Sequence, residues 1–176
     1  MVTLATIELQ NCWGSFVRAY YLSALLHART ESGHIVRSNS AIRSLDDGIG
    51  IAVRWWNPRA HPAATGVWRR RDEPPWFDPS ILLGLSKNLL FSNNGDIQAA
   101  LSMQSRAFAD LPILRNFFAH RNQASAFAAI SVAVQYSIGG IRVPSDVLLS
   151  RAKGRPQVLV LDWIDDIRAT VEMLCG

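Results

Sequence analysis

The sequence predicts an all-α protein, built as an up-and-down bundle of four to five main helices with an insertion after the first helix. Apolar residues recur at helical spacing through most of the chain, and clusters of Gly, Pro, Ser and Asn separate the segments that carry this spacing. The chain has 176 residues, of which 49% are hydrophobic. It is therefore expected to form one domain, residues 1–176, with a real core, which argues against disorder.

Helical periodicity predicts a long first helix over residues 4–30, which Ser32-Gly33 ends. Its apolar positions are Leu4, Ile7, Trp13, Phe16, Val17, Tyr20, Leu25 and Leu26. Further along the chain, the pattern predicts a helix over residues 80–91 with Ser80 as its N-cap. Another helix is expected from its cap, Asp96, to about Ala109.

The insertion, residues 34–80, holds five of the eight prolines and four of the six tryptophans. Within it, Ile51–Trp56 and Val67–Arg71 are compatible with two short strands of a β-hairpin. Its tryptophans, with the neighbouring arginines, would suit a surface that recognises nucleic acid. We favour the alternative that they cover the bundle or an oligomer interface, because large aromatic side chains bury so much area.

Beyond residue 110, one helix is expected to contain the segment Leu111–Asn122 and to continue, without further Gly or Pro, through Ala124 to Tyr136. The next clear break is at Gly139-Gly140. The remaining elements are a short helix after Pro144, a possible strand over Val158–Leu161, and a final helix capped by Asp162 that runs to about Leu174.

The segment Leu111–Asn122 combines an apolar helical pattern with polar side chains that can do chemistry. Pro112 is acceptable near a helix start, with Asp110 as the expected cap. Arg115, Asn116 and His120 stand out, because buried helix faces rarely carry such groups without a partner or a purpose.

Helical geometry relates the three polar residues to one another. Asn116 and His120 are four positions apart, so they share one face. Arg115 and His120 are five apart, so their directions differ by roughly 140°. A bend in the helix, the reach of the Arg side chain, or a second copy of the chain across a twofold axis would be needed to bring them together.

These side chains suit proton transfer at a phosphodiester. Histidine can give or take a proton near neutral pH, and arginine is a permanent cation whose fork matches a phosphate. In RNA the 2′-hydroxyl is a built-in nucleophile, so His120 would assist proton transfer while Arg115 stabilises the charge on the phosphoryl oxygens. No metal or cofactor would be needed.

Arg115, Asn116 and His120, late in a small helical domain, resemble the R-x(4–6)-H signature of the HEPN domain family, which often has Asn directly after the Arg. The resemblance implies a bundle of four or five helices and usually a homodimer. It also implies a metal-independent endoribonuclease, in which Arg115 and His120 are catalytic and Asn116 supports them at the dimer cleft.

Members of this family occur in toxin–antitoxin, abortive-infection and CRISPR-associated systems. The resemblance therefore implies a toxin or phage-defence effector with RNA as substrate and an antitoxin or defence protein as partner. One subgroup has a Tyr two places after the His, which a partner nucleotidyltransferase can modify, and Asn122 departs from it. Other members are inactive RNA-binding, nucleotide-binding or dimerisation modules that dock a partner, and this alternative stays open.

Weaker candidates for binding RNA are Arg121, beside the motif, and the run Arg69, Arg70 and Arg71. Asp72 and Glu73 follow that run at once, so it is equally well interpreted as a solvated, partly neutralised cluster. The bare Arg–His spacing also occurs from Arg29 to His34 and from Arg54 to His61. Neither stretch is expected to be helical, because Gly33 interrupts the first and Pro58 the second.

Charge and composition add general expectations. The net charge is +4 and the pI about 9.6, which is compatible with nucleic-acid binding. Cys12 and Cys175 are too few and too isolated for a disulfide framework or a zinc site. The chain shows no signal-peptide pattern and no apolar run of the roughly 18 residues that suggest a membrane span, so a cytoplasmic protein is expected.

Overall fold

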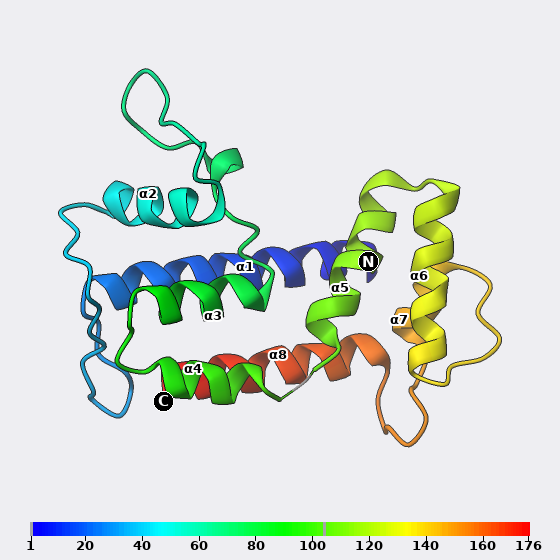
Figure 1. Ribbon diagram of the computed structural model, residues 1–176. Helices are drawn as coiled ribbons and strands as arrows, with labels where there is room; N and C mark the ends of the chain where they lie inside the picture. Colours follow the sequence, from blue (N-terminus) through cyan, green and yellow to red (C-terminus); the bar gives the residue numbers. More distant parts are fainter. Residues whose placement is uncertain (1, 104) are drawn as a thin grey trace. The chain divides into compact units, whose positions relative to one another are not determined.

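The computed structural model describes residues 2–103 and 105–176. Over these residues the chain forms eight α-helices, one short 3-10 helix and two isolated β-bridges, with no strand, which confirms the all-α prediction (Figure 1). The chain divides into two compact units. The motif unit comprises Met1–Cys12 and Gln104–Thr170, and the insertion unit comprises Trp13–Met103 and Val171–Gly176.

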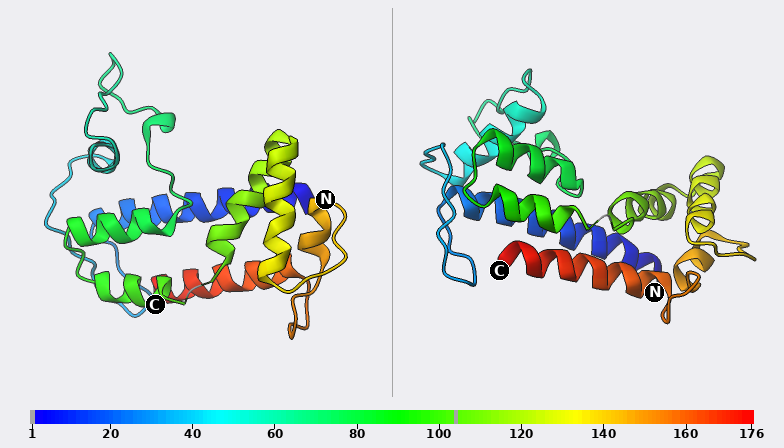
Figure 2. Two further views of the ribbon diagram at one scale, coloured as in Figure 1. Left: turned by 45° about the vertical axis from the view of Figure 1, so that its right-hand side comes forward. Right: turned by 60° about the horizontal axis from the view of Figure 1, so that its bottom comes forward.

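The motif unit is built around a hairpin of two antiparallel helices, α5 (Ala107–His120) and α6 (Gln123–Gln135), which lie side by side in Figures 1 and 2. Helix α7 (Pro144–Leu149) packs against α6, and most of α8 (Leu159–Cys175) completes the unit. Its core consists of buried apolar side chains, including Leu111, Leu114, Val132, Val147, Leu148 and Trp163.

A buried polar network joins α5, the end of α6 and α8. The Asp110 carboxylate is 3% exposed and accepts hydrogen bonds from the Tyr136 hydroxyl at 2.8 Å and from Arg106 Nε at 3.3 Å. Trp163 Nε1 donates to the same hydroxyl at 3.0 Å. The prediction of Asp110 as a helix cap is wrong, because α5 begins at Ala107. The Asp110 carboxylate is instead buried in the motif unit, where it binds Tyr136 and Arg106. Pro112 consequently lies within the helix.

The insertion unit contains α2 (Leu45–Trp56), the 3-10 helix η1 (Arg70–Asp72), α3 (Pro79–Asn88), α4 (Asn94–Leu101) and most of α1 (Val2–Leu25). The predicted strand over Ile51–Trp56 is wrong. Ser44 caps α2 by accepting a hydrogen bond from the Asp47 backbone N–H at 3.1 Å, which starts a helix through this segment. Residues 57–69 instead form a long loop that extends away from α2, so the hairpin does not form (Figures 1 and 2).

The tryptophans of the insertion mainly support packing. Trp76 is 3% exposed, and the Trp55 ring fills the space above Gly84, where an added Cβ would lie 2.5 Å from the ring. Trp68 packs in the same way against Gly50. Trp56 differs, being 51% exposed. The packing interpretation therefore fits three of the four tryptophans.

Several helix boundaries differ from the predicted ones. Helix α1 ends at Leu25, before the left-handed residue His27. Asp78 rather than Ser80 caps α3. Helix α4 ends at Leu101, and Asp162 lies in the first turn of α8 rather than at its cap. Val158 forms one isolated bridge with Arg151 in place of the strand over Val158–Leu161.

Candidate active site on helix α5

Arg115 and Asn116 lie within α5, and His120 lies at the turn of the α5–α6 hairpin. Helix α5 ends at His120, and Arg121 takes a left-handed conformation (φ 46°, ψ 40°) with its N–H bonded to the Phe117 carbonyl at 2.7 Å. Left-handed residues commonly end helices. The same conformation occurs at His27, Leu90 and Ser137, so at Arg121 it marks a helix end rather than functional strain.

The expected continuous helix from Leu111 to Tyr136 is therefore wrong. Asn122 breaks it by capping α6: its side chain accepts a hydrogen bond from the Ser125 N–H at 2.8 Å, and the Ser125 hydroxyl accepts one from the Asn122 N–H at 3.3 Å. This reciprocal pair is a capping box. The signal, an Asn followed three residues later by a small hydroxyl residue, is present in the sequence but weak.

Asn116 and His120 have the geometry expected from their spacing. Both are on α5, one turn apart, and both are exposed. Side chains four positions apart on a helix lie on the same face, as Asn116 and His120 do on α5. The imidazole lies in the last turn of α5, next to the exposed Arg121 side chain.

Arg115 is placed differently from His120. Its side chain is partly buried, and its Nε atom is buried without a hydrogen-bond partner in the described part of the chain. A buried donor without an acceptor is unusual in folded proteins. The spacing of five residues keeps the guanidinium and the imidazole roughly 140° apart around one helix. One straight α5 helix therefore presents the two groups in different directions.

The sequence around the motif carries positive charge and no negative charge. From Leu111 to Ser145 the chain contains three arginines and no acidic residue. The flanking carboxylates are both engaged: Asp110 binds Tyr136, and Asp146 accepts hydrogen bonds from the backbone N–H groups of Arg142 and Val143 at 3.1 Å each. A segment with cations and without carboxylates suits a polyanion such as a nucleic-acid backbone.

The arginine run of the insertion is partly used for folding. Arg70 binds Glu73 at 2.6 Å, and the Glu73 side chain, 4% exposed, also binds Arg18 at 2.6 Å and Trp76 at 2.7 Å. Arg71 lies 3.8 Å from the Asp72 carboxylate, and Arg69 is exposed. These pairs agree with the interpretation of a partly neutralised cluster.

The two other Arg–His matches have separate structures. Arg29 to His34 is irregular, as expected, with an isolated bridge between Arg29 and Ile35. The expectation that Arg54 is not helical is wrong, since it lies in α2, where its guanidinium stacks 5.6 Å from the Trp68 ring centroid. His61 follows in the long loop, beyond the end of that helix.

No protein-family model matches the chain, and no curated protein or solved structure matches it. Among the described residues, no group of three or more His, Cys, Asp and Glu side chains is placed to hold a metal ion. No helix in that part of the chain is both long and apolar enough to cross a membrane.

Proposed function

We propose that the protein is a metal-independent endoribonuclease of the HEPN type that acts as a homodimer. The observation that carries the proposal is the arrangement on α5: an exposed imidazole, His120, follows a guanidinium, Arg115, whose buried Nε has no partner among the described residues. Both lie in a segment without acidic side chains. This set can serve a phosphodiester, because it offers proton transfer and charge stabilisation together.

The reaction follows from the chemistry of RNA. His120 accepts the proton of the 2′-hydroxyl, and the 2′-oxygen forms a bond to phosphorus. The bond between phosphorus and the 5′-oxygen breaks, and the departing oxygen receives a proton. Arg115 stabilises the negative charge on the phosphoryl oxygens while both bonds are partial. The products are a 2′,3′-cyclic phosphate and a 5′-hydroxyl end.

A second copy of the chain explains how two separated groups act on one phosphate. Across a twofold axis, the Arg115 of one protomer can face the His120 of its partner, because each contact of an isologous interface occurs twice. The second imidazole is then available to protonate the leaving oxygen. Asn116, one turn before His120, would hold the imidazole in one orientation, and Arg121 would bind an adjacent phosphate of the RNA strand.

The test is RNA cleavage by the purified chain in the presence of a chelator. Wild type is expected to cut, and His120→Ala and Arg115→Ala are expected to lose about 100-fold or more in rate. His61→Ala is the matched control, since His61 is an exposed histidine of the long loop, and it should keep full activity. Thermal unfolding of each variant separates loss of chemistry from loss of fold. Equal cleavage by wild type and His120→Ala would remove the catalytic proposal.

A second candidate is a non-catalytic RNA-binding or dimerisation module that docks a partner. The partial burial of Arg115 favours it, because a guanidinium with a buried Nε can offer only part of its fork to a phosphate. Such a module would bind RNA with salt-dependent affinity and leave it uncut.

If the protein is an endoribonuclease that acts as a toxin or defence effector, its expression should arrest growth. We expect His120→Ala or a cognate antitoxin to relieve that arrest.

A further inference from the structure

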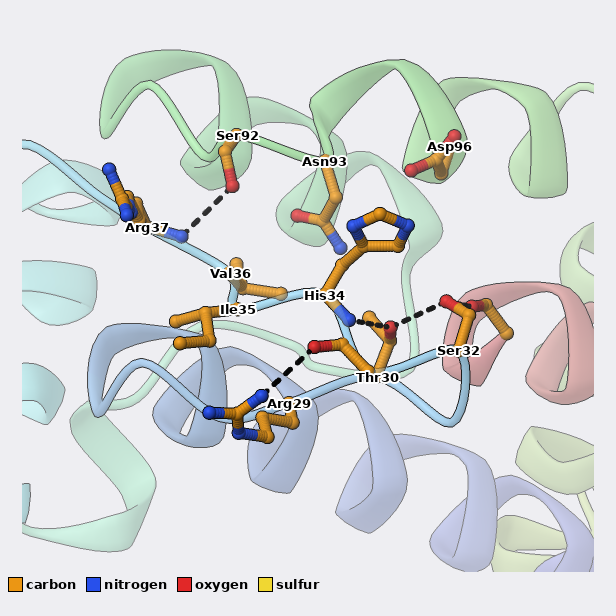
Figure 3. Close-up of a pocket in the computed structure, with 12 residues that line it drawn as sticks. Arg29, Thr30, Ser32, His34, Ile35, Val36, Arg37, Ser92, Asn93 and Asp96 are labelled. Carbon is orange, nitrogen blue, oxygen red and sulfur yellow. Dashed lines mark hydrogen bonds between the residues drawn. The ribbon is translucent and has the colours of Figure 1, made fainter.

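The insertion unit contains a cavity of about 680 Å³ between residues 29–37 and the connection from α3 to α4 (Figure 3). Two residues of its lining, Arg29 and His34, form the second Arg–His match of the sequence, which the proposed ribonuclease does not use. Cavities of this size are typical of small-molecule sites. The cavity is therefore a candidate binding site separate from the proposed ribonuclease site.

The walls of the cavity are held in place by backbone hydrogen bonds. The Thr30 N–H donates to the His34 carbonyl at 2.9 Å, which closes the loop on itself. The Arg37 N–H donates to the Ser92 hydroxyl at 2.9 Å, and the Ser92 N–H donates to the Arg37 carbonyl at 2.9 Å. These bonds fix residues 29–37 against the α3–α4 connection, so the cavity exists before any ligand enters.

Arg29 and Arg37 supply the cationic part of the lining. Arg29 Nη1 donates to the Gly33 carbonyl at 3.3 Å, which orients the guanidinium and uses one of its five N–H donors. The Arg37 side chain is exposed in the cavity wall. A guanidinium fork matches the oxygens of a phosphate group, and Figure 3 shows the two arginines on different sides of the cavity.

Acceptors gather in another part of the lining. His34, Asn93 and Asp96 also line an adjoining cavity of about 360 Å³, and Figure 3 shows all three around the same space. Asp96 is exposed. Asn93 Nδ2 donates to the Tyr20 hydroxyl at 2.6 Å, whereas the buried Asn93 Oδ1 has no partner within the described chain. The exposed Asp96 carboxylate can therefore accept hydrogen bonds from ligand hydroxyls.

The composition of the lining also argues against a ligand with an aromatic base. Among the described residues that line the cavity there is no Phe, Tyr or Trp, and the apolar side chains are Ile35 and Val36. Proteins that bind nucleotide bases commonly stack them on aromatic rings. The lining is therefore matched to a ligand with a phosphate and several hydroxyls rather than to one with an aromatic base.

We propose that this cavity is a binding site for a sugar phosphate. Arg29 and Arg37 supply the cations for the phosphate, Asp96 accepts hydrogen bonds from the sugar hydroxyls, and the His34 imidazole, in the same part of the cavity as Asp96, donates to the ligand. The site belongs to the insertion unit alone, so it stands independently of the ribonuclease proposal.

The test is isothermal titration of the full chain with ribose 5-phosphate, inorganic phosphate, ribose and AMP. Ribose 5-phosphate is expected to bind at least tenfold more tightly than inorganic phosphate, ribose or AMP. Arg37→Gln and Asp96→Asn, both at exposed side chains, should each weaken that binding at least tenfold. Arg43→Gln is the matched control, because Arg43 is an exposed arginine outside the cavity lining, and it should bind like wild type.

Each remaining outcome would overturn the proposal. Absence of binding at millimolar ribose 5-phosphate would remove the site, as would undiminished binding by Arg37→Gln. Inorganic phosphate bound as tightly as ribose 5-phosphate would reveal a simple anion site without sugar recognition. Tighter binding of AMP would show that the cavity selects a base, contrary to the argument from its lining.

Discussion

The Tyr136 hydroxyl donates a 2.8 Å hydrogen bond to the buried Asp110 carboxylate and so fastens the open ends of the α5–α6 hairpin together. Asp110 lies in the first turn of α5, and Tyr136 is the residue that ends α6. The closed end of the same hairpin carries His120 and Arg121. A structural clamp at one end thus fixes the two helices whose turn presents the proposed catalytic group.

Tyr136→Phe is expected to destabilise the fold. It removes the hydroxyl that serves both Asp110 and Trp163, so a buried carboxylate loses a donor and a buried indole loses an acceptor. The free energy of unfolding should fall by about 1–3 kcal/mol, measured by urea denaturation. Gln135→Ala, at an exposed neighbouring position, should change it by less than about 0.5 kcal/mol. A loss no larger for Tyr136→Phe than for this control would contradict the clamp.

Stability is expected to fall in alkaline solution. Burial, together with the bonded Asp110 carboxylate, raises the pKa of the Tyr136 hydroxyl above its usual value of 10.0, and burial raises the pKa of Tyr21 in the same direction. The folded chain keeps these protons where the unfolded chain has lost them. The contribution is therefore fully present below about pH 10 and is lost progressively above it, by up to about 1.4 kcal/mol per pH unit for each tyrosine.

Urea denaturation of wild type and Tyr136→Phe at a series of pH values from about 8 to 11 checks this expectation. The variant has one such tyrosine fewer, so its free energy of unfolding should decline less steeply above about pH 10. Parallel declines in the two proteins would show that the Tyr136 proton is not linked to folding.

Glu73→Gln should loosen the insertion unit. The Glu73 carboxylate is buried and is shared by Arg18, Arg70 and Trp76, so neutralising it leaves two cations without their common partner. Both arginines are partly exposed, which limits the loss to about 1.5–3 kcal/mol in the free energy of unfolding.

Asp72→Asn is the matched control for this carboxylate. Its ion pair with Arg71 is 3.8 Å long and partly exposed, and should contribute less than about 1 kcal/mol. If the two variants lost equal stability in chemical denaturation, Glu73 would not be the centre of the network.

Arg121→Gly separates binding from folding at the hairpin turn. Glycine adopts the left-handed conformation of residue 121 without a Cβ penalty, so stability should be unchanged or should rise by up to about 1 kcal/mol. If Arg121 binds a phosphate, the affinity for RNA should nevertheless fall, and its dependence on salt should become shallower. A filter-binding titration at several salt concentrations measures both, and an unchanged salt dependence would exclude a phosphate contact at Arg121.

The all-α fold could be predicted because helical periodicity is a local property. The errors arose where two local signals competed. Val53, Trp55 and Trp56 favour a strand by residue type, but the cap at Ser44 and the acidic first turn of α2 start a helix before they are reached. Asn122 interrupts an Ala-rich stretch by capping, without the Gly or Pro on which the predicted boundary relied.

The residues of the candidate sites likewise fall into two groups: those that local spacing places, and those whose surroundings depend on packing between distant segments. Asn116 and His120 could be placed on one helix face from their spacing alone, whereas their exposure is known only from the structure. The partial burial of Arg115 depends on packing, which spacing does not describe. The cavity at Arg29 and His34 forms only when residues 29–37 meet Ser92 and Asn93, more than fifty positions later in the chain. Contacts of this separation leave no local pattern.

The most direct test of the central claim is to identify the ends of RNA fragments made by the purified chain in a chelator, using mass spectrometry. Wild type should give 2′,3′-cyclic phosphate and 5′-hydroxyl ends, and a folded His120→Ala variant should give no fragments above background. Intact RNA after incubation with wild type, or the same fragments from the variant, would contradict the claim that His120 cleaves RNA.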